Sequence, residues 1–403
     1  MADSDIPVTL TRADALALSK ATTLAGLRAI WKGIYDRTAP PVVVPPKQPS
    51  FTVSGRQILD QTGKPVFLVG ANVAPQIIPG PYGFTQPDGR SAQGHVADAK
   101  AWGWNAIRVT VPWNGVGVSM TQTVAGVKAL IDEYTAAGIV CIVEWHGATG
   151  ANYPFDHFIH DPARQFWSAL LPQVKANPYV WVNFENEPIT SLRKDGSSLW
   201  IDYNRAVVDW VRPYAPSNII VADLPDSGQG DSDPAAIIDY KALCAMPNVV
   251  LSWHNYGAVI QRPEIGGDAA YYNVPNVGWY LRPDPAQPAT GEAQVRMWLS
   301  TFAALLFNAN LPVIIGECGF DWDNARQATG TVPRGYPLER VAAKWSLDKA
   351  TVQPLGISGV LAWHGNTESG IGAHSLRMAA LPWYDTVRPV SELGTLLRSA
   401  AGV

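Results

Sequence analysis

Eight short runs rich in Val and Ile recur from residue 51 onward, and longer amphipathic segments separate them. Such a run is typical of a buried strand, and apolar residues at helical spacing are typical of a helix that covers a sheet. Alternation of the two predicts parallel strands joined by crossover helices. The predicted strands are residues 67–72, 105–111, 139–145, 179–184, 218–223, 248–253, 312–317 and 357–363. The predicted helices between them include residues 121–137, 163–175, 198–212, 291–309 and 337–352.

Eight strand–helix units favour closure into a barrel over an open, doubly wound sheet. An open sheet of the dinucleotide-binding type would carry a Gly-rich phosphate-binding turn after its first strand, and residues 67–72 are not followed by one. A length of 403 residues fits either one large barrel domain or two ordinary domains. We therefore predict an α/β fold in which residues 51–403 form a (β/α)8 TIM barrel.

The residues before the barrel have a different pattern. Residues 11–36 are predicted to form a helix with an apolar stripe. The sequence APPVVVPPKQPS, residues 39–50, is typical of a semi-rigid linker. We expect a helical segment over residues 1–38, a Pro-rich linker over residues 39–50 and the barrel domain after it. A short helix on a stiff tether could self-associate, anchor the protein or pack against the barrel.

Composition argues against several kinds of partner. The formal net charge is -4 and no run of Lys or Arg occurs, which disfavours nucleic acid. No segment approaches the roughly 20 apolar residues of a membrane span. The first 20 residues lack a basic start followed by an uninterrupted apolar stretch, so they do not have the pattern of a secretory signal.

Polar and aromatic residues gather at the predicted strand ends, where TIM-barrel enzymes carry their catalytic residues. A lone strand-end His or Glu is usually structural, but charges that converge from six strands are costly unless they are paired or used. These residues are Arg108, Glu144, His146, Glu185, Asn186, Glu187, His254, Tyr256, Glu317 and Trp363.

Two glutamates stand at the ends of strands that would face each other, Glu187 and Glu317. Glycoside hydrolysis needs one carboxyl group to protonate the leaving oxygen and another to attack or stabilise the anomeric carbon. The pair therefore indicates a glycosidase. Glu144 and Glu185 are expected instead to pair with a barrel arginine, and Glu185 is expected to point inward by strand alternation.

Six short motifs occur in chain order on these strands: NAIRVTVPW, EWHG, NEP, WHNYG, VIIGECGF and LAWHGN. With them, roughly residues 55–400 resemble glycoside hydrolase family 5, a group of retaining (β/α)8 glycosidases that includes cellulases and β-mannanases. The resemblance implies Glu187 as general acid/base and Glu317 as nucleophile. It implies the remaining substrate-binding residues as Arg108, His146, Asn186, His254, Tyr256 and Trp363. No metal or cofactor is expected, and a retaining enzyme would hold its two carboxyl groups about 5–5.5 Å apart.

The strings EWHGATG, ADLPDSGQG, GECGFDWDN and AWHGNTESG look closer to the bacterial endo-β-1,4-mannanase branch than to typical cellulases. We expect endo-acting cleavage of β-mannan first, with cellulose or mixed β-glucan as the alternative. Such a polymer would be met outside the cell, so secretion is expected although no signal is visible. Candidate sugar platforms are Trp113, Trp145, Trp279, Trp322 and Trp383, and Asp223 and Gln229 could contact sugar hydroxyls or support the fold.

Three hypotheses from other classes remain open. A non-catalytic carbohydrate-binding barrel would be expected to lack one of the two glutamates. A metal-dependent barrel hydrolase would need His and Asp ligands at the strand ends, which a chelator would test. An attachment protein would depend on residues 1–50, and its mass in solution with and without them would test that idea.

Overall fold

The computed structural model describes residues 50–75, 94–111, 119–146, 162–187, 199–225, 227–230, 234–257, 271–274, 278–281, 288–320, 338–363 and 390–403. The chain divides into two units, Met1–Lys47 and Gln48–Val403, and the described residues belong to the second. The predicted helical segment and nearly all of the linker lie outside them, so the predicted domain boundaries stay a prediction.

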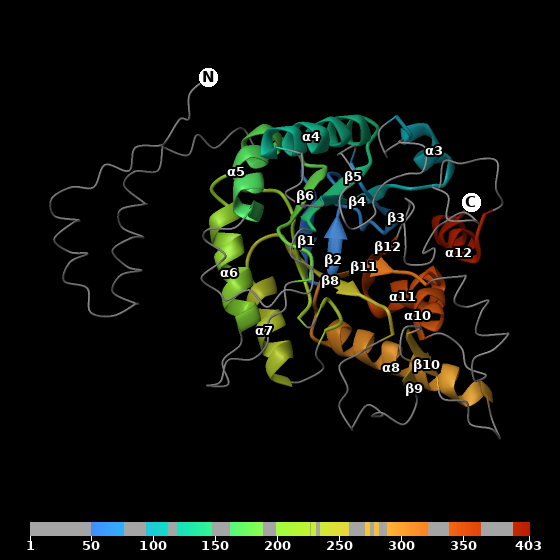
Figure 1. The fold of residues 1–403 in the computed structure, drawn as a ribbon. Helices are drawn as coiled ribbons and strands as arrows, with labels where there is room; N and C mark the ends of the chain where they lie inside the picture. Colours follow the sequence, from blue (N-terminus) through green and yellow to red (C-terminus); the bar gives the residue numbers. More distant parts are fainter. Residues whose placement is uncertain are drawn as a thin grey trace, which may run out of the picture. The chain divides into compact units, whose positions relative to one another are not determined.

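Eight parallel strands close into a barrel, as the sequence predicts, in the order β11-β12-β3-β4-β5-β6-β7-β8 (Figure 1). Each strand begins and ends within one or two residues of its predicted bounds. The strands are β3 (Leu68–Val73), β4 (Ala106–Val111), β5 (Val140–Trp145), β6 (Val180–Asn183), β7 (Ile220–Asp223), β8 (Val249–His254), β11 (Val313–Cys318) and β12 (Ile357–Ala362). The barrel closes where β12 pairs with β3, with Gly359 opposite Leu68 and Ala362 opposite Ala71.

Helices cover the outside of the barrel (Figure 1). They are α3 (Val96–Ala101), α4 (Met120–Ala136), α5 (Pro162–Val174), α6 (Leu199–Val211), α7 (Pro234–Cys244), α8 (Pro288–Asn308), α10 (Leu338–Ser346), α11 (Lys349–Val352) and α12 (Glu392–Ala401). Helix α4 begins with a capping box, in which the Ser119 hydroxyl accepts from the Gln122 backbone N–H and the Gln122 side chain accepts from that of Ser119. The predicted helix over residues 337–352 is divided into α10 and α11.

Two short hairpins accompany the barrel. Strands β1 (Thr52–Ser54) and β2 (Gln57–Leu59) pair with each other, and so do β9 (Tyr271–Val274) and β10 (Gly278–Leu281). Phe51 and Ile58 belong to the same buried cluster as Leu68, Ala106 and other inward residues at the N-terminal ends of the barrel strands. The first hairpin therefore packs against that end of the barrel.

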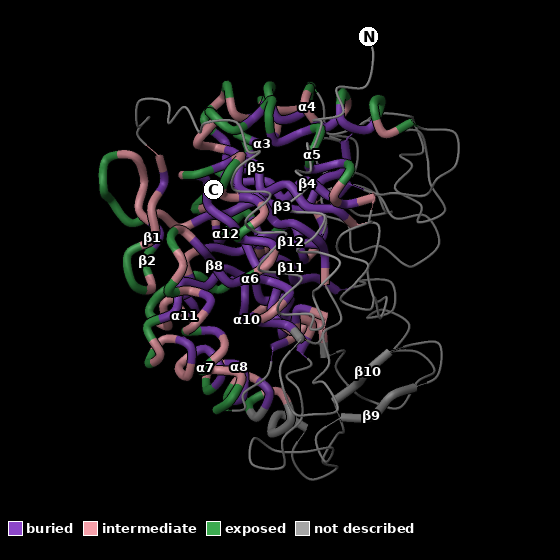
Figure 2. Tube along the Cα trace, turned by 90° about the vertical axis from the view of Figure 1, so that its left-hand side faces the viewer, coloured by how far each residue is buried: buried purple, intermediate pink, exposed green. Residues whose placement is uncertain are grey.

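The barrel interior changes character along its axis because inward residues alternate along each strand. Toward the N-terminal ends these residues are apolar, for example Val140 and Ile142 on β5. The next inward residue on β5, toward the C-terminal end, is the fully buried Glu144. A second, larger apolar cluster lies between the strands and the helices, and Figure 2 shows the buried residues concentrated there. The barrel interior is thus apolar at the N-terminal ends of the strands and polar at their C-terminal ends.

None of the helices in the described part of the chain combines the length and apolar composition that a membrane crossing requires.

Candidate active site

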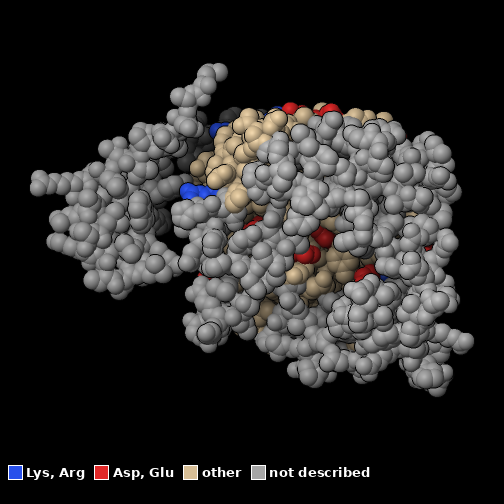
Figure 3. Space-filling view, in the orientation of Figure 1, with Lys and Arg blue, Asp and Glu red and all other residues tan. Residues whose placement is uncertain are grey.

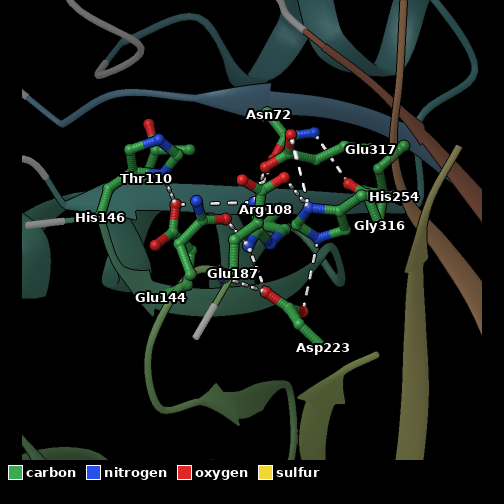
Figure 4. A network of polar contacts seen from close by, with 12 residues as sticks. Asn72, Arg108, Thr110, Glu144, His146, Glu187, Asp223, His254, Gly316 and Glu317 are labelled. Atoms are coloured by element: carbon green, nitrogen blue, oxygen red, sulfur yellow. Dashed lines mark hydrogen bonds and ion pairs between the residues drawn. The ribbon is translucent and has the colours of Figure 1, made fainter. Parts of the chain in front are cut away.

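Arg108 lies fully buried at the centre of the polar end of the barrel, where acidic side chains surround it (Figure 4). Its five N–H groups match five acceptors. The contacts are Nε to Asn183 Oδ1 at 2.9 Å, Nη1 to Asn72 Oδ1 at 3.0 Å and to Glu317 Oε1 at 2.6 Å, and Nη2 to Asn186 Oδ1 at 2.7 Å and to Asp223 Oδ2 at 3.3 Å. Burial alone would lower the pKa of Arg108, but Glu144, Asp223 and Glu317 raise it above its ordinary value. The guanidinium is therefore a fixed cation that aligns strand-end side chains.

Glu317 receives donors on both carboxylate oxygens. Oε1 accepts from Arg108, and Oε2 accepts from the Tyr256 hydroxyl at 2.9 Å. Burial raises the pKa of Glu317, while the positive charges of His254 and Arg108 act to lower it and Glu187 adds to the rise. Burial also raises the pKa of Tyr256 well above its ordinary value, so Tyr256 stays a neutral donor. The donors fit an ionised Glu317 carboxylate whose orientation is fixed.

His254 lies between acidic groups. Its Nδ1 atom lies 2.8 Å from Glu187 Oε1 and 3.6 Å from Glu317 Oε2, and Nε2 lies 3.4 Å from Asp223 Oδ1. Burial by itself lowers the pKa of His254, but Glu317, Asp223 and Glu187 raise it to about 10. The carboxylates around the ring therefore favour the protonated form of His254.

Glu187 lies in the loop after β6, and two neighbouring strands hold this loop. The backbone N–H of Asn186 donates to the Trp145 carbonyl on β5 at 2.9 Å. The backbone N–H of Glu187 donates to Asp223 Oδ2 on β7 at 3.0 Å. Glu187 has a φ of 46°, in the left-handed region that a glutamate rarely adopts. Its side chain remains 14% exposed, against 5% for Glu317.

The carboxyl groups of Glu187 and Glu317 are close. One carboxylate oxygen of each and a ring nitrogen of His254 all lie within 4.8 Å of one another. This closeness could also suit a cation, and among the described residues no other such group of three occurs. However, Nδ1 of His254 lies within hydrogen-bond distance of Glu187 Oε1, so a hydrogen bond between these two side chains accounts for the arrangement. In Figure 3 acidic side chains are visible near the middle of the face shown.

His146, which follows β5, contacts residues at the ends of both β5 and β12. Its Nδ1 atom lies 2.6 Å from Glu144 Oε1, and its ring stacks on Trp363 with centroids 5.2 Å apart and planes inclined by 20°. Glu144 also lies 3.6 Å from Arg108 Nη1. Although burial opposes it, Glu144 raises the pKa of His146. One face of the Trp363 ring is therefore against His146.

Comparison with known proteins settles the family. Residues 59–351 match the family model described as Cellulase (glycosyl hydrolase family 5). The chain belongs to glycosyl hydrolase family 5. The family and the class of enzyme expected from the sequence are therefore confirmed.

The family 5 chain is also similar to a curated mannan endo-1,4-beta-mannosidase from Streptomyces lividans, with 26% identity over 283 residues. The match covers 69% of this chain and 58% of that relative. A solved β-mannanase from Streptomyces thermolilacinus has a TM-score of 0.57 at 22% identity, covering 88% of this chain and 96% of that one. The catalytic domain of an endoglucanase from Thermobifida fusca has a TM-score of 0.56 at 17% identity, covering 88% and 97%. These two structures share the fold.

The eight family 5 site residues predicted from the sequence are all described, and the barrel brings seven of them into one connected set of contacts. Trp363 joins this set by stacking on His146. The predicted pairing of Glu144 with a barrel arginine is confirmed by its contact with Arg108.

Of two further expectations about neighbouring residues, one stays a prediction and one is wrong. The Oε2 atom of Glu185 accepts from the Tyr203 hydroxyl on α6 at 2.6 Å, and its pairing with a barrel arginine stays a prediction. Strand β6 ends at Asn183, so strand alternation no longer governs Glu185. Trp145 is not a sugar platform, because its side chain is 1% exposed and packs on Phe166. The side chains of Trp113, Trp279, Trp322 and Trp383 lie outside the described residues.

Sequence reasoning missed the buried amides that hold Arg108. Asn72 donates to the Gly316 and Ala362 carbonyls while its oxygen accepts from Arg108, and Asn183 bridges Arg108 and Asp223. Inward position near the C-terminal end of a strand is the signal that could have found both. Asp223, whose role stayed open, contacts Arg108, Asn183 and the Glu187 backbone.

Two glycines make room for His254. A Cβ atom on Gly228, whose φ is 74°, would lie 2.5 Å from Cγ of His254. A Cβ atom on Gly316 would lie 2.1 Å from Ser252 Oγ and 3.3 Å from His254 Nε2. The backbone N–H of His254 donates to the Gly228 carbonyl at 2.8 Å. The loop after β7 is therefore fitted closely against the imidazole.

Proposed function

We propose that this protein is an endo-acting, retaining glycoside hydrolase that cleaves a β-1,4-linked polysaccharide, with Glu187 as acid/base and Glu317 as nucleophile. The observation that carries the proposal is the closeness of these carboxyl groups, whose nearest oxygens lie within 4.8 Å. Retaining enzymes hold their carboxyl groups about 5–5.5 Å apart, whereas inverting enzymes leave about 6.5–9.5 Å for a water molecule. The separation favours double displacement.

In the first step, Glu317 would attack the anomeric carbon while Glu187 gives its proton to the leaving oxygen. Arg108 and Tyr256 hold both oxygens of Glu317, so the attacking carboxylate needs no reorientation. A covalent glycosyl ester forms on Glu317, and the cleaved half of the chain departs as an alcohol.

In the second step, Glu187 would act as a base. It takes a proton from water, the resulting hydroxide attacks the anomeric carbon, and Glu317 leaves as a carboxylate. Asn186, whose oxygen is bound by Arg108, is held beside Glu187 and is proposed to bind the sugar 2-hydroxyl. His146, His254 and Tyr256 line the same site, and Trp363 is proposed to support a sugar ring.

β-Mannan is the favoured substrate, because the curated relative that the sequence matches is a mannan endo-1,4-beta-mannosidase. Cellulose is the alternative, since an endoglucanase and β-mannanases are similar in fold to about the same degree. Glucose and mannose differ in one hydroxyl group, so a few contacts decide between them.

Reducing-sugar release from galactomannan, glucomannan and carboxymethylcellulose, measured side by side, tests the proposal. We expect the fastest release from galactomannan or glucomannan, and a β-anomer as the first product by proton NMR. A faster rate on carboxymethylcellulose would favour the endoglucanase alternative. Absence of cleavage of all three would refute the function.

A polymeric substrate implies action outside the cell, and polysaccharide is the partner proposed here, without nucleic acid or membrane. Residues 1–38 are proposed to support self-association or anchoring. The molar mass in solution of the full chain and of a chain lacking residues 1–50 tests this, and equal oligomeric states would exclude self-association through that segment.

A further inference from the structure

The carboxylate of Asp223, at the end of β7, is shared among several parts of the site (Figure 4). Oδ2 accepts from the Glu187 backbone N–H at 3.0 Å and from Arg108 Nη2 at 3.3 Å. Oδ1 accepts from Asn183 Nδ2 at 3.2 Å and lies 3.4 Å from Nε2 of His254. Asp223 is 1% exposed, so every one of these contacts lies away from bulk water.

The first consequence concerns the backbone of Glu187. A φ of 46° is unfavourable for a residue with a long side chain, and such strain persists only where the surroundings impose it. The Glu187 N–H donates to Asp223. Trp200 Nε1 on α6 in turn donates to the Asp223 backbone carbonyl at 2.8 Å. The acid/base residue is thus held through a carboxylate whose own backbone is fixed.

The second consequence concerns the protons of His254. Nδ1 faces Glu187 and Nε2 faces Asp223, and an ionised carboxylate can only accept. A neutral imidazole has one N–H group and would leave one nitrogen lone pair facing a carboxylate. The charged and titratable groups around the ring come from β7, the loop after β6, β11, β4 and the loop after β8: Asp223, Glu187, Glu317, Arg108 and Tyr256.

We propose that Asp223 is a positioning residue for the reaction proposed above: it seats Glu187 and keeps the second proton on Nε2 of His254. Nδ1 then always donates to Oε1 of Glu187, which leaves Oε2 to carry the proton that is transferred. His254 keeps both of its protons throughout. Glu187 alone gives a proton to the leaving oxygen and regains one from water.

Nitrogen-15 NMR of histidine-labelled protein tests the proton on Nε2, because it distinguishes a ring with two N–H groups from a neutral ring. The chain has seven histidines, and the variant His254→Gln assigns the signal by removing it. We expect His254 to keep both protons from about pH 5 to about pH 8 in the wild type, the range in which an ordinary histidine titrates. In Asp223→Asn the ring should titrate within that range.

Asp132→Asn is the matched control, since this aspartate pairs with Lys128 on the surface of α4 and is 57% exposed. Its His254 signal should equal that of the wild type. A wild-type His254 that is neutral at pH 7, or one unaffected by Asp223→Asn, overturns the proposal. The wild-type spectrum decides even if Asp223→Asn does not fold.

Asp223→Glu separates the two roles. The charge remains, so His254 should stay doubly protonated, but the longer side chain displaces the acceptor of the Glu187 N–H, and kcat should fall about 10²-fold with KM little changed. An unchanged kcat would overturn the seating of Glu187. This inference rests on the proposed function. A wild type that cuts no polysaccharide would refute that function. An active wild type, together with an Asp223→Asn variant whose His254 nitrogen signals are unaltered, would refute only the inference.

Discussion

Nη1 of Arg108 donates to Oε1 of Glu317 over 2.6 Å, and both side chains are nearly inaccessible to water, at 0% and 5% exposure. Each charge would be costly in this position without the other. Because the same guanidinium also binds Asn186 and Asp223, the proposed nucleophile Glu317 is part of a network that spans the barrel mouth. We therefore expect a change at Arg108 to affect both stability and catalysis.

Arg108→Met is expected to destabilise the fold by about 3–5 kcal/mol, because it leaves buried carboxylates without their cation. Turnover should fall as well, since Glu317 loses a donor and the charge that favours its ionised form. Urea unfolding followed by fluorescence measures the first effect, and initial rates on the preferred polysaccharide measure the second.

The matched control is Arg340→Met. Arg340 donates to Glu392 on the surface of the barrel with both side chains partly exposed, at 26% and 36%. Such pairs contribute about 0–1 kcal/mol, so the control should unfold almost like the wild type. Equal losses in the two variants would contradict the role of Arg108 as the centre of the network.

The pH profile should reflect the environment of Glu317. Burial raises its pKa, and the positive charge of His254 counteracts this rise. Because the proposed nucleophile must be ionised, we expect activity to be lost as the pH falls through this pKa. Replacement of His254 by Gln removes the counteracting charge and should move the acid limb of kcat/KM to higher pH, by about one unit or more.

Glu187 and Glu317 titrate as an interacting pair, so the measured limb belongs to the pair. Profiles of wild type, His254→Gln and the surface control Asp132→Asn measured in the same buffers make the comparison. An acid limb that moves to lower pH in His254→Gln would show that His254 does not stabilise the ionised nucleophile.

Much of the fold is visible in the sequence because the barrel strands are buried on both faces. Runs such as VIIGE and NVVLSW are apolar at nearly every position, so the first and last residues of the strand can be read from the sequence. The predicted strands begin and end within one or two residues of the observed ones. The site residues follow for a related reason, since charged residues that converge from several apolar strands are costly unless they are paired or used.

What the sequence does not reveal depends on short-range geometry. Glu185 follows the end of β6, and only the position of α6 shows that Tyr203 is its partner. Asp223 ends its strand like other polar residues. Its contacts, however, are with Glu187 and His254, which lie 36 and 31 residues away from it in the sequence. Trp145 lies beside a site histidine and yet faces the opposite, apolar side of the strand.

The variant Glu187→Ala should distinguish an acid/base residue from a purely binding one. On polysaccharide, kcat/KM should fall about 10²–10⁴-fold, the usual contribution of general acid–base catalysis. An aryl glycoside whose phenolate leaves without protonation should still glycosylate Glu317, and added azide should speed release of the sugar. Equal losses on both substrates, with no response to azide, would contradict the assignment.

Gly228→Ala should impair catalysis beyond its effect on the backbone. Any Cβ atom at this position strains a residue with a φ of 74° and would lie 2.5 Å from His254 Cγ, so the imidazole must move. Gly138→Ala is the control, because Gly138 has a φ of 77° but no atom within 4 Å of the added carbon.

The control should lose about 1–2 kcal/mol of stability from backbone strain and keep its kcat. Gly228→Ala should lose more stability and about 10²-fold in kcat, because His254 can no longer hold Glu187 in place. Equal kcat values for the two variants would mean that the position of His254 does not limit the reaction.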